Sequence, residues 1–140
     1  MFQDYTEAFE KLLQLSIKDH KVIVSVIIHC CLSEKLFNPY YAVLAQKFCD
    51  FDRKYQLAIQ FSLWDRIKDI KSLTNIQIKN MAQFGIHLIE NGGQALSVLK
   101  IVEFGEMDKV TLRLVRQIVL GLLLGKESTC KQVIICCFFT

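Results

Sequence analysis

Residues that break helices are scarce along this chain. A single proline and six glycines stand among 140 residues, so few positions can interrupt a helix. Hydrophobic residues make up 52% of the sequence and charged residues 22%, which excludes disorder for most of the chain. A chain of this length has room for one domain and not for two. The sequence therefore predicts a single, predominantly helical domain.

Capping signals mark where the helices begin. Asp4 and Glu7 have the spacing of a capping box, as do Thr74 and Gln77. Asn38 precedes the proline, which is favoured at the first position of a helix because its missing N–H would be unpaired there anyway. Together with recurring apolar residues, these signals predict helices from about residue 4, over 19–32, from 39, over 53–70, from 75 to about 90, and over 109–124.

Two of the predicted helices indicate how the domain packs. The helix over 19–32 is apolar all round, so we expect neighbours to cover it on several sides. A strand is the alternative for this run of β-branched residues, but the run is long for a strand and has no turn residues. The helix over 53–70 has two apolar stripes, as an inner helix of stacked helix pairs has: Tyr55, Ile59, Leu63, Ile67 and Ile70, and Leu57, Phe61 and Trp64.

Residues 94–107 are ambiguous. They fit a short helix over 95–99 followed by an extended segment or loop. Six or seven helices with short links and no convincing strand predict an all-α stack or bundle.

Charge and cysteine usage narrow the setting in which the chain works. The formal net charge of +3 falls short of the dense basic stripe of a dedicated nucleic-acid binder. No signal peptide is visible, and the apolar runs are too short or too charged to span a bilayer, so we expect no membrane partner. The six cysteines are then expected to be reduced thiols, most of them in the core.

Catalytic and metal-binding patterns are weak. No phosphate-binding glycine loop and no C-x-x-C pair is present, and no carboxylate pair is set apart for acid–base work. His29, Cys30 and Cys31 are adjacent on a helix and therefore point in different directions. A thiol enzyme built on Cys49 and His87 is conceivable, but a reactive thiol needs a polar, electropositive setting and Cys49 lies among apolar residues. The sequence thus predicts no enzyme, no cofactor, no metal and no small-molecule substrate.

A loose group of basic residues surrounds the predicted helix over 53–70. Its members are either a solvated face or a contact for RNA phosphates or an acidic partner: Arg53, Lys54, Arg66, Lys68 and Lys71.

Three segments resemble a known family. Residues 31–69 are similar to the heart of the MA3 domain (also called the MI domain), in the version found in nucleolar proteins with a MIF4G domain. Residues 4–15 resemble the start of that domain and residues 97–119 its end, so the resemblance covers about 4–124. The most specific motifs are Asn-Pro-Tyr-Tyr at 38–41, Phe-Cys at 48–49, and residues 61–65.

The resemblance implies both a fold and a function. It implies an antiparallel stack of helix pairs of the HEAT type, which acts as a scaffold rather than as an enzyme. It implies docking to a DEAD-box RNA helicase of the translation-initiation type. For the nucleolar branch it implies a location in the nucleolus or nucleus and work on pre-ribosomal RNA and the small ribosomal subunit. The spliceosomal relative with the same two domains is the alternative, and an RNA-binding helical module is another.

The resemblance also directs attention to charged residues near helix ends, because MA3 domains use acidic and polar residues there to contact helicases. On this chain the candidates for a contact face are Asp50, Asp52 and Asp65 with Arg53 and Arg66. Helix capping and pairing within a helix are the alternative roles for each. The aromatic residues nearby are predicted to belong to the core: Tyr40, Phe48, Phe61 and Trp64.

The sequence departs from the family pattern in two respects. No MIF4G domain lies within these 140 residues, so we expect a fragment, a truncated product or a stand-alone form. Residues 126–140 match nothing typical of the family and are apolar and rich in cysteine. We therefore divide the chain into an MA3-type helical domain over 1–125 and an atypical tail over 126–140.

Overall fold

The structure is a computed structural model that describes residues 5–14, 19–102 and 104–125. Within these ranges the chain is helical and contains no strand, which confirms the predicted all-α class. The elements are α1 (Tyr5–Gln14), α2 (His20–Ser33), α3 (Pro39–Phe51), α4 (Arg53–Lys68), η1 (Ile70–Ser72), α5 (Asn75–Glu90), η2 (Leu96–Ile101), η3 (Phe104–Glu106) and α6 (Lys109–Leu123), where η denotes a 3₁₀ helix.

The predicted caps form. Thr74 and Gln77 make the expected capping box at the start of α5, with hydrogen bonds of 3.2 and 2.9 Å. The Asn38 side chain accepts the N–H of Tyr40 at 3.0 Å, with the proline in the first turn of α3. The proposed partner of Glu7, Asp4, lies outside the described residues. Local side-chain chemistry thus decides where these helices begin.

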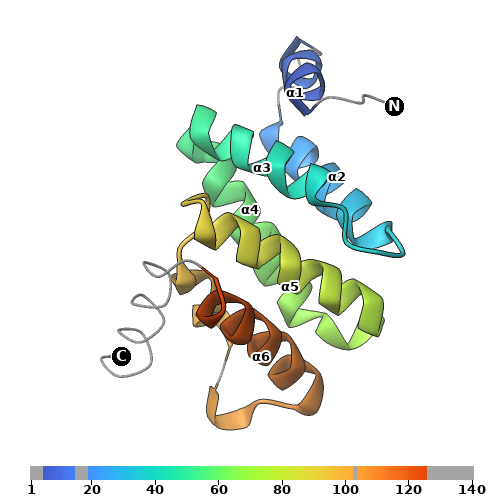
Figure 1. Cartoon of the computed structure of the whole chain (residues 1–140), viewed down its shortest axis with the longest axis vertical. Coiled ribbons are helices and arrows are strands. Elements are labelled where there is room, and N and C mark those ends of the chain that lie inside the picture. Colours follow the sequence, from blue (N-terminus) through green and yellow to red (C-terminus); the bar gives the residue numbers. More distant parts are fainter. Residues whose placement is uncertain (1–4, 15–18, 103, 126–140) are drawn as a thin grey trace.

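The helices form two layers (Figure 1). Contacts join α1, α3, α5 and α6 into one layer and α2, α4 and η2 into the other. Neighbours within a layer run in the same direction. The indole N–H of Trp64 donates to the carbonyl of Val98 at 2.7 Å, and the Gln94 amide donates to the carbonyl of Gln56 at 2.7 Å, so α4 and η2 are parallel.

The same holds for the last two helices of the first layer. Arg113 in the second turn of α6 donates to the Asn75 side chain at the start of α5. Near the other end, a Cβ added to Gly121 would lie 2.3 Å from Ile86 Cδ1. Two parallel helices need a connection that returns the chain, and η2 returns it along α4. Parallel neighbours within each layer, with chain reversals between the layers, confirm the expected HEAT-like stack of helix pairs.

A continuous core lies between the layers. Its largest fully buried side chains include Phe48 of α3, Phe84 of α5 and Leu114 of α6. The buried Asn80 of α5 donates to the carbonyl oxygens of Cys31 and Glu34 at 3.3 and 2.8 Å. These carbonyls lie at the end of α2, where a helix has no internal donors left. Asn80 therefore joins α5 to α2 while satisfying the end of that helix.

The exposure of α2 and α4 corrects two predictions. Val26 is 54% exposed, because α3, α4 and α5 cover α2 on one side only. On α4, Phe61 is 54% exposed and Leu57 is also exposed, whereas Trp64 is half-buried against η2. The second stripe of α4 is therefore not an inner face, and Phe61 is not a core residue. The inner faces of α2 and α4 pack against other helices, whereas no described element covers their outward faces.

The ambiguous segment after α5 folds into 3₁₀ turns rather than an α-helix. Gly92 takes a φ of +82° just beyond the end of α5, as the expected glycine stop requires. The segment over 96–101 is the 3₁₀ helix η2. Helix α4 ends two residues earlier than expected, at Lys68, and η1 follows it.

Burial predicts opposite outcomes for two phenylalanines. Phe48→Ala should lower the free energy of unfolding by about 3–5 kcal/mol, because removing this fully buried ring leaves a cavity in the core. Phe61→Ala should cost less than about 1 kcal/mol because its ring is already half in water. Urea unfolding followed by circular dichroism measures both, and equal losses would contradict this placement of the core.

Candidate partner-binding surface

The chain reverses between α3 and α4 through a single residue. Asp52 has an extended backbone, with φ −155° and ψ 137°, and it ends one helix while it begins the next. Its N–H donates to the carbonyl of Phe48 at 3.1 Å, and its carboxylate accepts the N–H of Lys54 at 3.0 Å. One acidic side chain thus caps α4 at a sharp corner.

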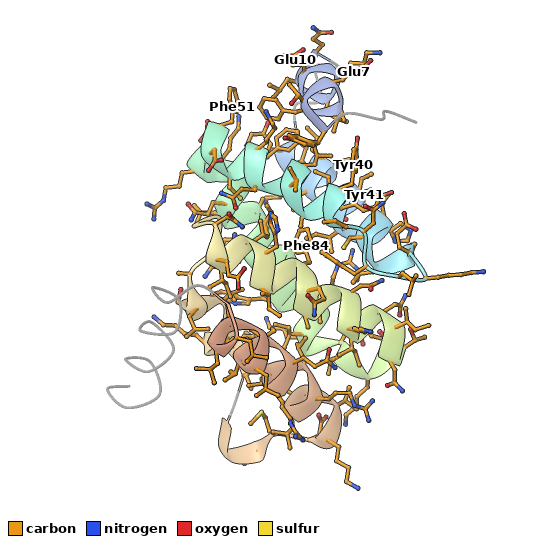
Figure 2. All side chains as sticks on the ribbon, in the orientation of Figure 1. Glu7, Glu10, Tyr40, Tyr41, Phe51 and Phe84 are labelled. Atoms are coloured by element: carbon orange, nitrogen blue, oxygen red, sulfur yellow. The ribbon has the colours of Figure 1, made fainter. Side chains whose placement is uncertain are left out.

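This corner presents charged groups around an aromatic ring. We call it the α3–α4 tip and define it as Asp50, Phe51, Asp52 and Arg53, all of which are exposed. Phe51 is 56% exposed at the outer end of α3, whereas Phe84 lies in the interior (Figure 2). No tip residue forms an ion pair with another described residue, although Asp50 accepts a hydrogen bond from Gln46 at 2.9 Å. The tip can therefore contact a partner through two carboxylates and a ring.

Aromatic packing holds the tip in place. The ring of Phe48 lies 4.8 Å from those of Phe9 and Tyr55, and Phe9 also meets Phe51 edge-on at 5.6 Å. Such edge-to-face pairs add stability beyond the apolar area that they bury. Because Phe9 belongs to α1, the first helix is joined to the tip, which reduces the ordering cost of binding there.

The other two predicted contact residues lie elsewhere. Asp65 and Arg66 are 13 and 14 residues beyond Asp52, about 20 Å along α4 at 1.5 Å per residue. They line a groove between α2, α4 and η1 with a volume of about 250 Å³: Ser25, Ser62, Asp65, Arg66, Asp69, Ser72 and Leu73. Burial lowers the pKa of the half-buried Arg66 guanidinium. The five predicted residues thus form two separate surfaces.

Sequence reasoning missed part of each surface. Phe51 could have been recognised as an aromatic residue between two acids at a helix junction. Asp69 follows Asp65 by one helical turn and could also have been found. Ser25 could not, since only the packing of α2 on α4 brings it to the groove.

The expected basic group does not form one patch. Arg53 and Lys54 lie at the start of α4, whereas Lys68 and Lys71 lie at or beyond its other end. The Lys54 ammonium is 5.4 Å from the centre of the Tyr55 ring, and that of Lys71 is 3.9 Å from a carboxylate oxygen of Asp108. A continuous phosphate-binding stripe is absent from this helix.

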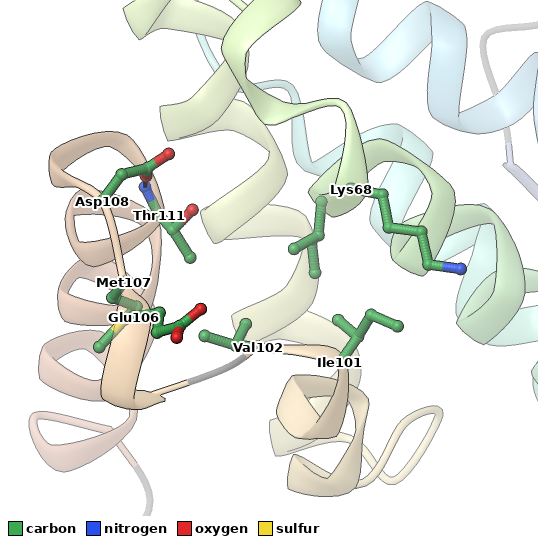
Figure 3. A pocket seen from close by; sticks show the side chains of 8 residues that line it. Lys68, Ile101, Val102, Glu106, Met107, Asp108 and Thr111 are labelled. Atoms are coloured by element: carbon green, nitrogen blue, oxygen red, sulfur yellow. Dashed lines mark hydrogen bonds between the residues drawn. The ribbon is translucent and has the colours of Figure 1, made fainter.

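A small pocket lies where α4, η2 and α6 meet (Figure 3). It has a volume of about 130 Å³, and its lining mixes apolar residues such as Val102 and Met107 with Glu106 and Asp108. Sites for drug-sized ligands have volumes of about 300–1,000 Å³. Backbone donation from Thr111 at 2.8 Å lowers the pKa of Asp108, because this carboxylate caps α6. The pocket thus belongs to the packing around a helix start.

Two thiols in the described residues, Cys31 and Cys49, are poor nucleophiles. Burial raises the pKa of Cys31 and of Cys49 to about 12, with smaller effects from neighbouring acids. A catalytic thiol needs the opposite shift. Cys31 is in the core as expected, whereas Cys30 and Cys49 are half-buried. Among the described residues no group of three or more histidines, cysteines and acids could hold a metal ion, and no described helix is long and apolar enough to cross a membrane.

Comparison with known proteins identifies the class to which this arrangement belongs. The family model of the MA3 domain matches residues 1–95. The chain belongs to the MA3 domain family, as the motifs in its sequence predicted.

Relatives extend the similarity over most of the chain. It is 52% identical over 125 residues to the Nucleolar MIF4G domain-containing protein 1 homolog of Drosophila melanogaster, and 42% identical over 128 residues to Nucleolar MIF4G domain-containing protein 1 of Mus musculus. These matches cover 89% and 90% of the chain but 15% of each relative. The Pre-mRNA-splicing factor CWC22 homolog of Drosophila melanogaster is 24% identical over 107 residues, which cover 75% of the chain and 8% of that protein. The chain thus corresponds to a small part of proteins that are much longer.

The raised thiol pKa values lead to a prediction about alkylation. At pH 8 a thiol with a pKa of about 12 is ionised in only about one molecule in 10⁴, so Cys31 and Cys49 should resist iodoacetamide in the folded chain. Both should react fully in urea, where burial is lost. Mass spectrometry of the digested protein locates the label, and rapid native labelling of Cys49 would revive the thiol-enzyme alternative.

Proposed function

We propose that this domain is a non-catalytic scaffold that docks a DEAD-box RNA helicase of the translation-initiation type. The proposed setting is the nucleolus or nucleus, in pre-ribosomal RNA processing and assembly of the small ribosomal subunit. Relatives at 52% and 42% identity support this setting, since their names carry the word nucleolar. Pre-ribosomal RNA is a second proposed contact of the assembled complex, and the helicase is the primary ligand.

The observation that carries the proposal is the chemistry of the α3–α4 tip. Asp50 and Asp52 are exposed, unpaired with any described cation, and flank an exposed ring. A helicase that grips RNA presents lysines and arginines for the phosphates. An acidic and aromatic tip complements such a basic surface, and charge complementarity of this kind accelerates encounter and sets orientation. Arg53 at the edge of the tip would pair with an acidic residue of the partner.

Two alternative functions can be distinguished from the proposed role in ribosome assembly: a spliceosomal scaffold and direct RNA binding. The similarity to a splicing factor favours a spliceosomal scaffold that uses the same tip with a different helicase, although its identity is less than half that of the first relative. Direct RNA binding predicts an affinity that falls steeply with salt. The separation of Arg53 and Lys54 from Lys68 and Lys71 along α4 weighs against it.

Charge neutralisation at the tip tests helicase docking. The double variant Asp50→Asn, Asp52→Asn removes both charges while asparagine keeps the cap of α4. We expect it to weaken binding to an initiation-type DEAD-box helicase by about tenfold or more, which corresponds to about 1.4 kcal/mol. Isothermal titration calorimetry at two salt concentrations measures the affinity and its ionic component.

A matched variant in the groove makes the result specific. Asp65→Asn removes a carboxylate from the same helix about 20 Å away and should leave the affinity unchanged. Loss of binding in this variant alone would show that the helicase contacts the groove between α2, α4 and η1 instead of the tip. A folded chain that binds no such helicase at low salt would contradict the proposal.

A further inference from the structure

Four basic side chains lie near the point where α5 and α6 begin. The two helices pack side by side and run in the same direction, so both start at the same edge of the first layer (Figure 1). There Arg113 of α6 donates to the side chain of Asn75, the first residue of α5. Lys79 follows Asn75 by about one helical turn. Lys109 and Arg116 lie about one turn before and after Arg113. The α5–α6 basic surface is defined by these four residues: Lys79, Lys109, Arg113 and Arg116.

The residues of the α5–α6 basic surface face solvent and keep their charge. All four are exposed. The three on α6 recur after four and three residues, which places them on one side of the helix, whereas Leu114 and Ile118 are buried. None of the four forms an ion pair with a described residue, and α6 itself contains no acidic residue. Four positive charges are therefore available to an anionic partner.

The acidic residues just before α6 do not neutralise this surface. Asp108 accepts the N–H of Thr111 at 2.8 Å, and its other carboxylate oxygen lies 3.9 Å from the ammonium of Lys71. This carboxylate thus already has a hydrogen-bond donor and a cation. Glu106 is exposed nearby, which leaves positive charges in excess among the described residues of this edge. Both helices also direct the positive ends of their dipoles to the same edge.

The side chains of α5 and α6 indicate which anion fits. No phenylalanine, tyrosine or tryptophan is exposed on these two helices, whose one such ring is the buried Phe84. Single-stranded nucleic acids are held largely by stacking of their bases on exposed rings. Protein interfaces are enriched in aromatic residues and depleted in lysine, whereas this surface has two lysines and no ring. A nucleic-acid helix carries its phosphates on the outside, so cations alone can bind it.

We propose that the α5–α6 basic surface binds the phosphate backbone of double-helical RNA. The cations of α4 are spread along that helix, whereas these four lie within about one turn of the contact between Arg113 and Asn75. The inference deepens the proposed function and rests on it for the choice of RNA, since it names the residues that would meet pre-ribosomal RNA. The α3–α4 tip belongs to other helices, so the helicase and the RNA contact different residues.

The salt dependence of RNA binding counts the phosphate contacts. Fluorescence anisotropy of a labelled RNA duplex of about 16 base pairs measures binding by the full chain without a helicase. Each contact adds about −0.9 to the slope of log K against log salt, so four cations predict a slope between about −3 and −4. The triple variant Lys79→Gln, Lys109→Gln, Arg116→Gln should reduce the slope to about −1 and weaken binding by about tenfold or more. Arg113 is kept because it joins α6 to α5.

A control variant removes the same charge from the other layer. Lys21→Gln, Lys54→Gln, Lys100→Gln changes three exposed lysines on α2, α4 and η2. At about 100 mM salt, charges separated by more than about 10 Å are largely screened, so this variant should keep the slope and bind within about twofold of the unaltered chain. Equal losses in the two triple variants would mean that RNA responds only to net charge and would overturn the proposal. Absence of duplex binding by the unaltered chain at about 50 mM salt would overturn it too.

Competitors identify the kind of anion that the surface prefers. Displacement of the RNA by a polyglutamate peptide at equal charge concentration would assign the surface to an acidic protein and contradict the proposal. We expect the RNA duplex to bind at least as tightly as a DNA duplex of the same sequence, and tighter binding of the DNA would refute the choice of RNA. The tip variant Asp50→Asn, Asp52→Asn should bind the RNA duplex no more weakly than the unaltered chain. Lost RNA binding with intact helicase docking would therefore reject this inference alone, and the converse would reject only helicase docking.

Discussion

The reversal of the chain at Asp52 sets the geometry of both layers. Only one residue separates α3 from α4, so the two helices must leave the corner in different layers. The N–H of Asp52 completes the end of α3, and its carboxylate supplies an acceptor at the start of α4. Phe48, whose carbonyl accepts that N–H, is also a fully buried core residue. The corner and the core are thus built from the same turn of helix.

Beyond this corner, polar contacts join the successive helix pairs of the stack. Asn80 joins α5 to the end of α2, Trp64 joins α4 to η2, and Gln46 donates to the carbonyl of Asn91 at 3.1 Å. Gly93 lies close enough to the Gln46 side chain that an added Cβ would fall 2.2 Å from its oxygen. A backbone that approaches so closely leaves little freedom between α3 and the end of α5. The inner faces of the helices are buried against one another, so only the outward faces can contact other molecules.

The chemistry of the charged and thiol side chains depends on which of them the packing of the helices buries. Burial raises the pKa of the Cys31 and Cys49 thiols, and Asp108 serves as a helix cap. Exposed carboxylates lie beside both ends of α4: Asp50 and Asp52 at the tip, and Asp65 and Asp69 in the groove. The two groups of carboxylates are about 20 Å apart along α4. This arrangement is found here in a chain of the MA3 domain family.

The sequence by itself determined the helices, their caps and the family. Thr74 with Gln77, Asn38 before the proline, and Gly92 after α5 act within four residues of the chain, so their effects can be read locally. Only the tertiary structure decided which apolar faces stay exposed, as at Phe61, Val26 and Leu112, and which charged residues share a surface. Asp50 and Asp65 look equivalent in the sequence, yet α4 separates them by its length. A helical pattern shows that a face is apolar, but only the packing of neighbouring helices determines whether it is covered.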